Sequence, residues 1–232
     1  ATPQMDFHWK KLRRWGAGVR ESLSFAVSPP NWEAKLSSVL PFGEPGEEFF
    51  EFGLTSCTQY LEYGAGASTL RATELGVELV CVESDARFLS SVERNCRLTN
   101  SASALHNRYL YADIGRTGPW GKPVLPTVKR PKTWRRYALA PWRLLGEGFR
   151  ADFVLVDGRF RVACALAVVA HQPDTNWTML VDDYGGRKHY DAIEQFAQII
   201  TFHGRMAQFQ SKPNVDRSEV LGALDKYCLD WR

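Results

Sequence analysis

From residue 59 onward, short apolar segments alternate with amphipathic segments, and few folds satisfy that pattern. The apolar segments cover residues 59–63, 78–84, 108–114, 152–158 and 177–184. Helical periodicity is expected over residues 68–75, 85–98, 161–172 and around 190–200. Parallel strands need a helical connection between them, so this order predicts an α/β fold: a doubly wound, mostly parallel sheet with helices on both faces. Residues 204–210 and 226–232 are expected to form a closing pair of strands.

The remaining segments divide the chain. Residues 1–58 are expected to form an N-terminal helical extension, and residues 59–232 the main domain, within a single folded unit. Residues 115–150, rich in proline, glycine and tryptophan, show no sustained period and are longer than an ordinary connection. We therefore expect an insert after the third strand that acts as a lid.

Composition excludes several classes of protein. No apolar run approaches the roughly 18 residues needed to span a bilayer, and the first residues lack a signal-like apolar core. The 5 cysteines are scattered, which argues against a disulfide framework and a zinc site. We expect a cytoplasmic protein without a membrane partner. The net charge of +3 is too small to indicate a polyanion partner by itself.

A glycine-containing turn follows the first predicted strand. Gly64 and Gly66 suit a strand-to-helix turn where a ligand approaches the backbone, and Ser68 and Thr69 suit the start of the helix. Thr69 stands where the dinucleotide fingerprint needs its third glycine, which weakens a nicotinamide or flavin interpretation.

Acids end the first three predicted strands. Glu62 is placed to hold a cationic amino group, and Glu83 to accept hydrogen bonds from ribose hydroxyls. Asp113 ends the third strand in the same way. Three such acids fit a ligand with an amino group, a ribose and an adenine, but no phosphate.

The segments "LEYGAGAST", "CVESD", "ADIG" and "DFVLVDG" occur in the order found in class I S-adenosylmethionine-dependent methyltransferases, and the chain resembles that family over about residues 60–210. More narrowly, "DIGRTGPWGKP" and "DDYGGRKHYDAIEQF" resemble a group of methyltransferase-like proteins of unassigned substrate. The resemblance implies a Rossmann-like sheet that binds S-adenosylmethionine. It implies that the cofactor contacts Glu62, Tyr63, Gly64, Ala65, Gly66, Ser68, Thr69, Glu83, Ser84, Asp113, Ile114 and Asp157.

Three further acids end the fourth and fifth predicted strands: Asp157, Asp182 and Asp183. Carboxylates gathered at one edge of a sheet need a compensating cation if they are desolvated. A divalent metal such as Mg²⁺ is one candidate, with all three aspartates as ligands. The alternative is that Arg159, Arg161 and Arg187 neutralise them, or that these arginines bind an acidic substrate.

The segment "LVDDYGG" resembles the fifth-strand motif of metal-dependent sugar O-methyltransferases, and the fourth-strand acid is shared with catechol O-methyltransferase-like enzymes. In the sugar enzymes a second acid, proposed as general base, follows two residues after the fourth-strand acid. Arg159 occupies that place here, which puts the metal and the base in doubt. The candidate catalytic residues are Asp157, Asp183, Arg159 and Tyr184, although Tyr184 is also suited to packing.

Three functions remain open. The first is a methyltransferase acting on an oxygen, or less favourably a nitrogen, of a small substrate held under the lid. The second is a protein that binds S-adenosylmethionine or S-adenosylhomocysteine without transfer activity. The third is an RNA or nucleotide methyltransferase, because Trp134, Tyr137 and Trp142 alternate with basic residues in a way that suits nucleic acid. The same residues also suit a lid whose aromatic side chains pack inward.

Overall fold

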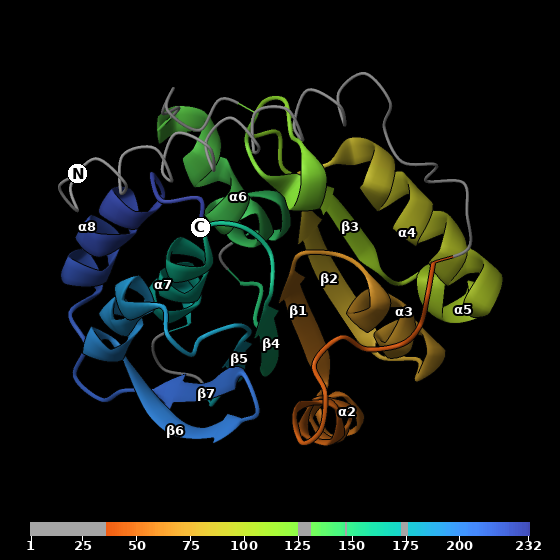
Figure 1. Ribbon diagram of the computed structural model, residues 1–232, viewed down its shortest axis with the longest axis horizontal. Helices are drawn as coiled ribbons and strands as arrows, with labels where there is room; N and C mark the ends of the chain where they lie inside the picture. The colour runs from red at the N-terminus through yellow and green to blue at the C-terminus, as the bar shows by residue number, and fades with distance from the viewer. Residues whose placement is uncertain (1–35, 125–130, 147, 173–175) are drawn as a thin grey trace, which may run out of the picture.

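The computed structural model describes residues 36–124, 131–146, 148–172 and 176–232. It contains one seven-stranded sheet of order β3-β2-β1-β4-β5-β7-β6 (Figure 1). The strands β1 to β5 are parallel, whereas β7 runs antiparallel to both of its neighbours, β5 and β6. The mostly parallel, doubly wound sheet is confirmed. Most of the expected N-terminal extension lies outside the described residues.

The strands are β1 (Gln59–Tyr63), β2 (Glu78–Glu83), β3 (Arg108–Tyr111), β4 (Phe153–Val156), β5 (Thr178–Val181), β6 (Ala197–His203) and β7 (Met206–Ser211). The α-helices are α2 (Gly46–Ser56), α3 (Ala67–Glu74), α4 (Ala86–Thr99), α5 (Ser101–Ala104), α6 (Pro131–Leu145), α7 (Arg161–His171) and α8 (Arg217–Tyr227). Two 3-10 helices, η1 (Pro119–Gly121) and η2 (Lys188–Gln195), complete the described elements. Among these helices, none combines the length and apolar character needed to cross a bilayer.

The sheet buries both of its faces because its strands place alternate side chains on opposite sides. On one face, Leu61 and Tyr63 of β1 belong to the core that includes α6 and α7. On the other, Tyr60 packs near Phe50 of α2, with ring centroids 5.8 Å apart. Helices α3 and α4 pack against each other beside β2 and β3 (Figure 1).

Helix α6 corrects the expectation that residues 115–150 have no sustained helical period. Trp134, Tyr137, Ala138 and Trp142 recur at helical spacing and are buried in the core. The Trp134 indole N–H donates to the carbonyl of Ile114 at 3.1 Å. Prolines at both the start and the interior of this helix make the segment look irregular in sequence, but its apolar stripe covers the sheet. Residues 131–145 are therefore a regular helix of the core, and the action of residues 115–150 as a lid stays a prediction.

Two expectations near the C-terminus are also wrong. The helix expected around 190–200 is the short η2 followed by β6, because Ala197–His203 pairs with Met206–Ser211 as an antiparallel hairpin. The strand expected over 226–232 does not form, since Lys226 and Tyr227 end α8. The strand expected at 204–210 is confirmed as β7.

The two environments of tryptophan in residues 115–150 give a test of the α6 assignment. Trp134 is 1% exposed and Trp120 is 80% exposed. Replacing Trp134 with alanine should lower the free energy of unfolding by about 3–5 kcal/mol because a buried aromatic is lost. Trp120→Ala, the matched control, should change it by less than about 0.5 kcal/mol. Urea unfolding measures both, and equal effects would contradict the packing of α6.

Candidate functional site

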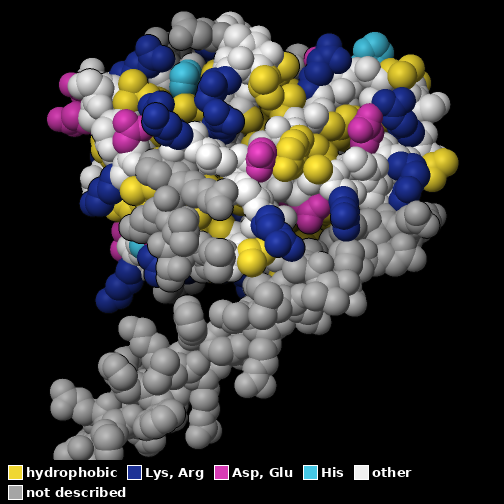
Figure 2. Space-filling view, turned by 90° about the horizontal axis from the view of Figure 1, so that it is seen from above, with side chains coloured by type: hydrophobic (Ala, Val, Ile, Leu, Met, Phe, Trp, Pro, Cys, Tyr) yellow, Lys and Arg dark blue, Asp and Glu magenta, His cyan; other side chains and the backbone are white. Residues whose placement is uncertain are grey.

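The candidate site lies where the carboxyl ends of β1 and β4 meet. These neighbouring parallel strands connect onward in opposite directions, β1 to β2 and β4 to β5. In open α/β sheets a ligand binds beyond the strand ends at such a switch point. Figure 1 shows the carboxyl ends of β1 and β2 at the top, and Figure 2 views that side, where acidic, basic and hydrophobic side chains are interspersed.

The two glycines of the turn after β1 serve different purposes. Gly64 has a φ of 97°, and a Cβ there would lie 2.8 Å from Cα of Gly158, just after β4. Gly64 therefore allows two backbones to approach, and its contact with the cofactor stays a prediction. A Cβ on Gly66 would meet nothing within 4 Å. The open space lies at Gly66, immediately before the amides of α3.

Glu62 lies fully buried beside this turn. Its Oε2 accepts a hydrogen bond from the Tyr60 hydroxyl at 2.9 Å, and its Oε1 accepts one from the Thr69 hydroxyl. The Thr69 oxygen in turn accepts from the Gly66 amide at 2.8 Å. Burial raises the pKa of Glu62 from 4.5 to about 7, against the opposing effect of these hydrogen bonds. Glu62 and Thr69 thus fix the glycine turn from within.

Glu83 ends β2 beside the same turn. Its Oε1 accepts from the Ser84 amide at 2.5 Å, the Ser84 hydroxyl at 3.0 Å and the Asp85 amide at 2.9 Å. Its Oε2 accepts from the Ala65 amide at 3.3 Å. Burial raises the pKa of Glu83. The carboxylate links the ends of β1 and β2, and Oε2 keeps capacity for a further donor such as a sugar hydroxyl.

The other residues implied for the cofactor are placed unequally. Asp113 is exposed and accepts from the Gly115 amide at 2.8 Å. Ala65 is half-buried in the turn. The Tyr63 hydroxyl donates to the carbonyl of Ala138 at 2.7 Å, so its side chain belongs to the core. The side chains of Ser68, Thr69, Ser84 and Ile114 are also buried.

Arg161, the first residue of α7, connects the ends of β4 and β5. Its guanidinium is almost fully buried and donates to Asp157 Oδ1 at 2.8 Å and to the carbonyl of Asp157 at 3.1 Å. It also donates to the carbonyls of Gly158 and Asp182, and lies 3.4 Å from Asp183 Oδ2. Five contacts of this kind fix the two strand ends relative to each other.

The second and third acids have arginine partners of their own. Arg205, in the hairpin between β6 and β7, binds Asp182 through two hydrogen bonds of 2.7 and 2.8 Å. Arg187 binds Asp183 at 2.8 Å. Arg205 could not be identified from the sequence, because no local motif marks it and only the pairing of β7 with β5 brings that hairpin to the site.

A metal site does not fit this arrangement. The oxygens that would bind Mg²⁺ accept hydrogen bonds from Arg161, Arg187 and Arg205, and a guanidinium that near would repel a divalent cation. Within the described ranges, no group of three His, Cys, Asp or Glu residues is arranged to hold a metal. Of the two explanations for the acids, the arginine partners have the geometric support.

The candidate catalytic residues also differ in their placement. Asp157 has 27% of its side chain exposed, and burial raises its pKa from 3.8 to about 7 despite Arg161. Asp183 is held by Arg187. The Tyr184 hydroxyl donates to Glu194 at 2.8 Å, and its ring packs against Phe209, so Tyr184 has the packing role. Arg159 is half-buried beside Asp157.

Backbone strain is concentrated at this edge. Phe160 and Asp183, which follow β4 and β5, have φ values of 56° and 51°. Trp120, in the loop above β2, has a φ of 60°. Residues other than glycine rarely adopt this conformation, and it occurs often at functional sites. Three of the four non-glycine residues with positive φ in the described ranges therefore lie at the same edge as the charged residues, and the fourth, Asn214, follows β7.

No protein-family model matches this sequence, and no curated protein matches it significantly. A methyltransferase-like protein from Silicibacter pomeroyi, known from a crystal structure, is 32% identical, with a TM-score of 0.68. The match covers 84% of this chain and 98% of that one. The chain belongs to the class I S-adenosylmethionine-dependent methyltransferase-like family.

Two other solved structures are similar to the present chain, at lower sequence identity. The Podospora anserina methyltransferase PaMTH1, bound to S-adenosylhomocysteine (SAH), is 13% identical with a TM-score of 0.39, covering 84% of this chain and 88% of that one. The methyltransferase MycE of the mycinamycin biosynthetic pathway, in complex with Mg and SAH, is 14% identical with a TM-score of 0.40. That match covers 77% of this chain and 51% of MycE.

The buried Glu62 should make stability depend on pH. A carboxyl whose pKa is raised on folding stabilises the fold at low pH, and that contribution is lost as pH rises from its unfolded value of 4.5 through about 7. Glu62→Gln does not titrate, so its stability relative to the parent protein should improve by about 2 kcal/mol between pH 5 and pH 8. Urea unfolding at both pH values measures this, and an unchanged difference would contradict the burial.

Proposed function

We propose that this protein is an S-adenosylmethionine-dependent methyltransferase that transfers the methyl group to an oxygen of a small molecule. The observation that supports this proposal most strongly is that the open turn after β1 is hydrogen-bonded to the acid that ends β2. The open turn at Gly66 precedes the amides of α3, and the Ala65 amide of that turn donates to Glu83 at 3.3 Å. Family membership agrees with this assignment. The acid suits the ribose of an adenosine ligand, and the turn suits an amino-acid group attached to it.

The residues suit the parts of this cofactor in order. Glu83 would accept the ribose hydroxyls, with Oε2 as the available oxygen. The space at Gly66 and the first amides of α3 would receive the amino-acid end, whose carboxylate is favoured at a helix N-terminus. Exposed Asp113 would lie on the adenine side. Glu62 would act indirectly, because it fixes the turn through Thr69.

Bound S-adenosylmethionine supplies a sulfonium methyl group: the acceptor oxygen bonds to the methyl carbon, the carbon–sulfur bond breaks, and its electron pair leaves with sulfur to give S-adenosylhomocysteine. The protein must align the acceptor and accept its proton. Asp157 is suited to be the base, because it is partly exposed beyond β4 and its pKa is about 7. Arg161 orients it at 2.8 Å.

A small acceptor has more support than RNA. The aromatic residues of α6 proposed for base stacking, Trp134, Tyr137 and Trp142, are at most 3% exposed and pack in the core. They are unavailable to unstacked bases. A protein that binds the cofactor without transfer remains the second candidate, favoured by Arg159 at the place where a base stands in related enzymes. Turnover separates the two.

Calorimetric titration with SAH tests the cofactor assignment. The parent protein should bind SAH and should not bind NAD. Gly66→Leu should weaken SAH binding about 10- to 100-fold, because the new side chain fills the open space at the turn. Gly222→Leu is the matched control, since it also adds a side chain where nothing lies within 4 Å, but on exposed α8. Unchanged SAH affinity in Gly66→Leu would contradict the proposed site.

The role of Asp157 predicts a pH dependence of methyl transfer. A base must be deprotonated, so kcat should rise as pH increases through about 7 and level off above it. Asp157→Asn should lower kcat about 100- to 10,000-fold with little change in SAH affinity. SAH release from a panel of hydroxylated acceptors measures turnover. SAH binding without turnover on any acceptor would instead favour the cofactor-binding protein.

A further inference from the structure

The charges beyond β4 and β5 leave one cation in excess. We define the edge cluster as Asp157, Asp182, Asp183, Arg161, Arg187 and Arg205, whose three acids and three arginines contact one another. Arg159 lies between Asp157 and Arg161 in sequence but is outside these contacts. Of the described residues, none forms an ion pair or hydrogen bond with its guanidinium. The positive charge of Arg159 is thus available for a ligand.

The environment of Arg159 makes an unpaired guanidinium energetically unfavourable. Its Nε is buried without a hydrogen-bond partner, although the residue as a whole is half-buried. Burial and the nearby Arg161 lower the pKa of Arg159. A guanidinium that is partly removed from water and lacks an anion destabilises the fold. Such a cost is typical of a residue whose partner is a ligand.

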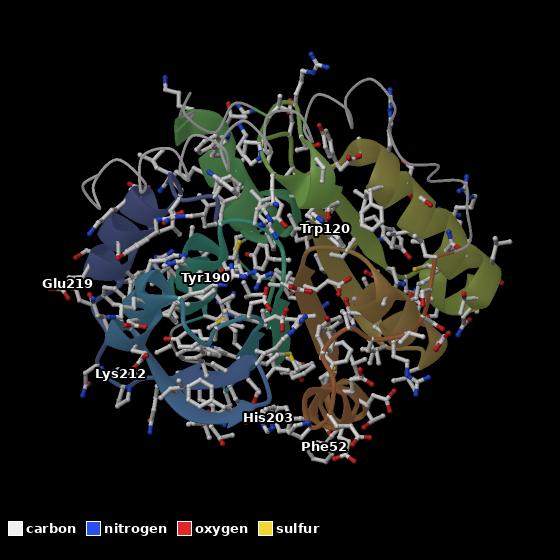
Figure 3. All side chains as sticks on the ribbon, viewed as in Figure 1. Phe52, Trp120, Tyr190, His203, Lys212 and Glu219 are labelled. Atoms are coloured by element: carbon white, nitrogen blue, oxygen red, sulfur yellow. The ribbon has the colours of Figure 1, made fainter. Side chains whose placement is uncertain are left out.

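The position of Arg159 connects it to the proposed cofactor site. A Cβ placed on Gly121 would lie 3.8 Å from Arg159 Cγ and 3.7 Å from Glu83 Oε1. The Arg159 stem and the Glu83 carboxylate therefore both lie close to Gly121 in the loop of residues 115–124. That loop is closed by hydrogen bonds from Gly118 to Lys122 at 2.7 Å and from Val124 to Arg116 at 2.9 Å. Trp120 of the same loop is exposed and lies near the carboxyl end of β2 in the view of Figure 3.

We infer that Arg159 binds a carboxylate or phosphate of the methyl acceptor, so that the substrate is an anionic hydroxy compound. This inference rests on the proposed function. A planar guanidinium binds either anion through two parallel hydrogen bonds and so fixes its orientation. Asp157, the proposed base, is two residues away at the end of the same strand. An acceptor held at Arg159 would therefore place its hydroxyl near the group that takes its proton.

One other anion would be present in the site, the carboxylate of the cofactor itself. The α3 amides beside Gly66 already provide donors for it. Arg159 belongs instead to the turn after β4, which carries Asp157, the proposed base, and packs against the turn after β1 where Gly158 meets Gly64. The acceptor is therefore the source that we assign to Arg159, and the experiment must distinguish the two.

The first measurement is thermal unfolding with inorganic phosphate, in the presence of saturating SAH. Phosphate should raise the Tm of the parent protein, and Arg159→Gln should lose at least half of that rise. Arg136→Gln is the matched control, an exposed arginine of α6, and should keep the full rise. Arg159→Lys, which keeps the charge, should retain part of it. An equal phosphate response in Arg159→Gln and the parent protein would overturn the inference.

Two further arms separate the sources of the anion. SAH and methylthioadenosine, which lacks the amino-acid carboxylate, are titrated into Arg159→Gln. Affinities within about twofold of the parent protein support the acceptor. A loss of SAH affinity of about tenfold or more, with methylthioadenosine unaffected, would show that Arg159 binds the cofactor carboxylate and would overturn the inference. If the parent protein binds no SAH, the proposed function fails; the phosphate arm without SAH then tests the anion site alone.

Turnover gives the second readout. Aromatic and aliphatic hydroxy acids are compared with their primary amides, which have similar shape without the charge. The parent protein should methylate the acids, and Arg159→Gln should lower kcat/KM for them about 10- to 100-fold while leaving the amides unchanged. Equal turnover of acids and amides by the parent protein would overturn the inference.

Discussion

The buried guanidinium of Arg161 is the interaction on which the candidate site depends. It binds the backbone of Asp157, Gly158 and Asp182 and the side chain of Asp157. A buried arginine is stable only when its donors and its charge are matched, and these carbonyls and carboxylates supply both. Without it, Asp157, Asp182 and Asp183 would repel one another at the strand ends. Arg161 therefore offsets the repulsion between these acids and fixes the position of Asp157 after β4.

A second constraint is the close approach of the turns after β1 and β4. Gly64 and Gly158 pack with no room for a Cβ on either, and the Tyr137 hydroxyl fills the remaining space near Gly158. That hydroxyl also donates to the carbonyl of Val82 at 3.3 Å, at the end of β2. Helix α6 thus supports three strand ends from one face of the sheet. Residues 131–145, which belong to the segment expected to act as a lid, therefore support these strand ends.

The sequence predicted the parts of the fold that follow from local periodicity. The strands β1, β2, β4 and β5 and the helices α3, α4 and α7 lie close to their expected positions, because apolar runs and amphipathic stretches alternate there. Two elements were not predicted. Proline and tryptophan residues obscured the apolar stripe of α6, and Ala197–His203, expected to be part of a helix, forms an edge strand. An edge strand gains its stability from pairing with β7, which is a tertiary contact.

The same distinction holds for the site. Acids at strand ends could be recognised, because the parallel order alone brings them to one edge. Their partners could not be assigned, since neutralising the acids and binding an acidic substrate were equally plausible roles for Arg159, Arg161 and Arg187. The structure gives Arg161 and Arg187 to the aspartates, adds Arg205 from a hairpin, and leaves Arg159. The sequence likewise could not show that Gly64 is needed for backbone packing whereas Gly66 leaves open space, because the packing partner of Gly64 lies about ninety positions away in the chain.

The contact between Gly64 and Gly158 has a mechanical consequence. Two backbones in direct contact transmit displacement, as no side chain between them can change rotamer to absorb it. A shift of the turn after β1 would therefore move the segment that carries Asp157 and Arg159. The two halves of the switch point, one proposed to face the cofactor and the other the acceptor, would therefore move together.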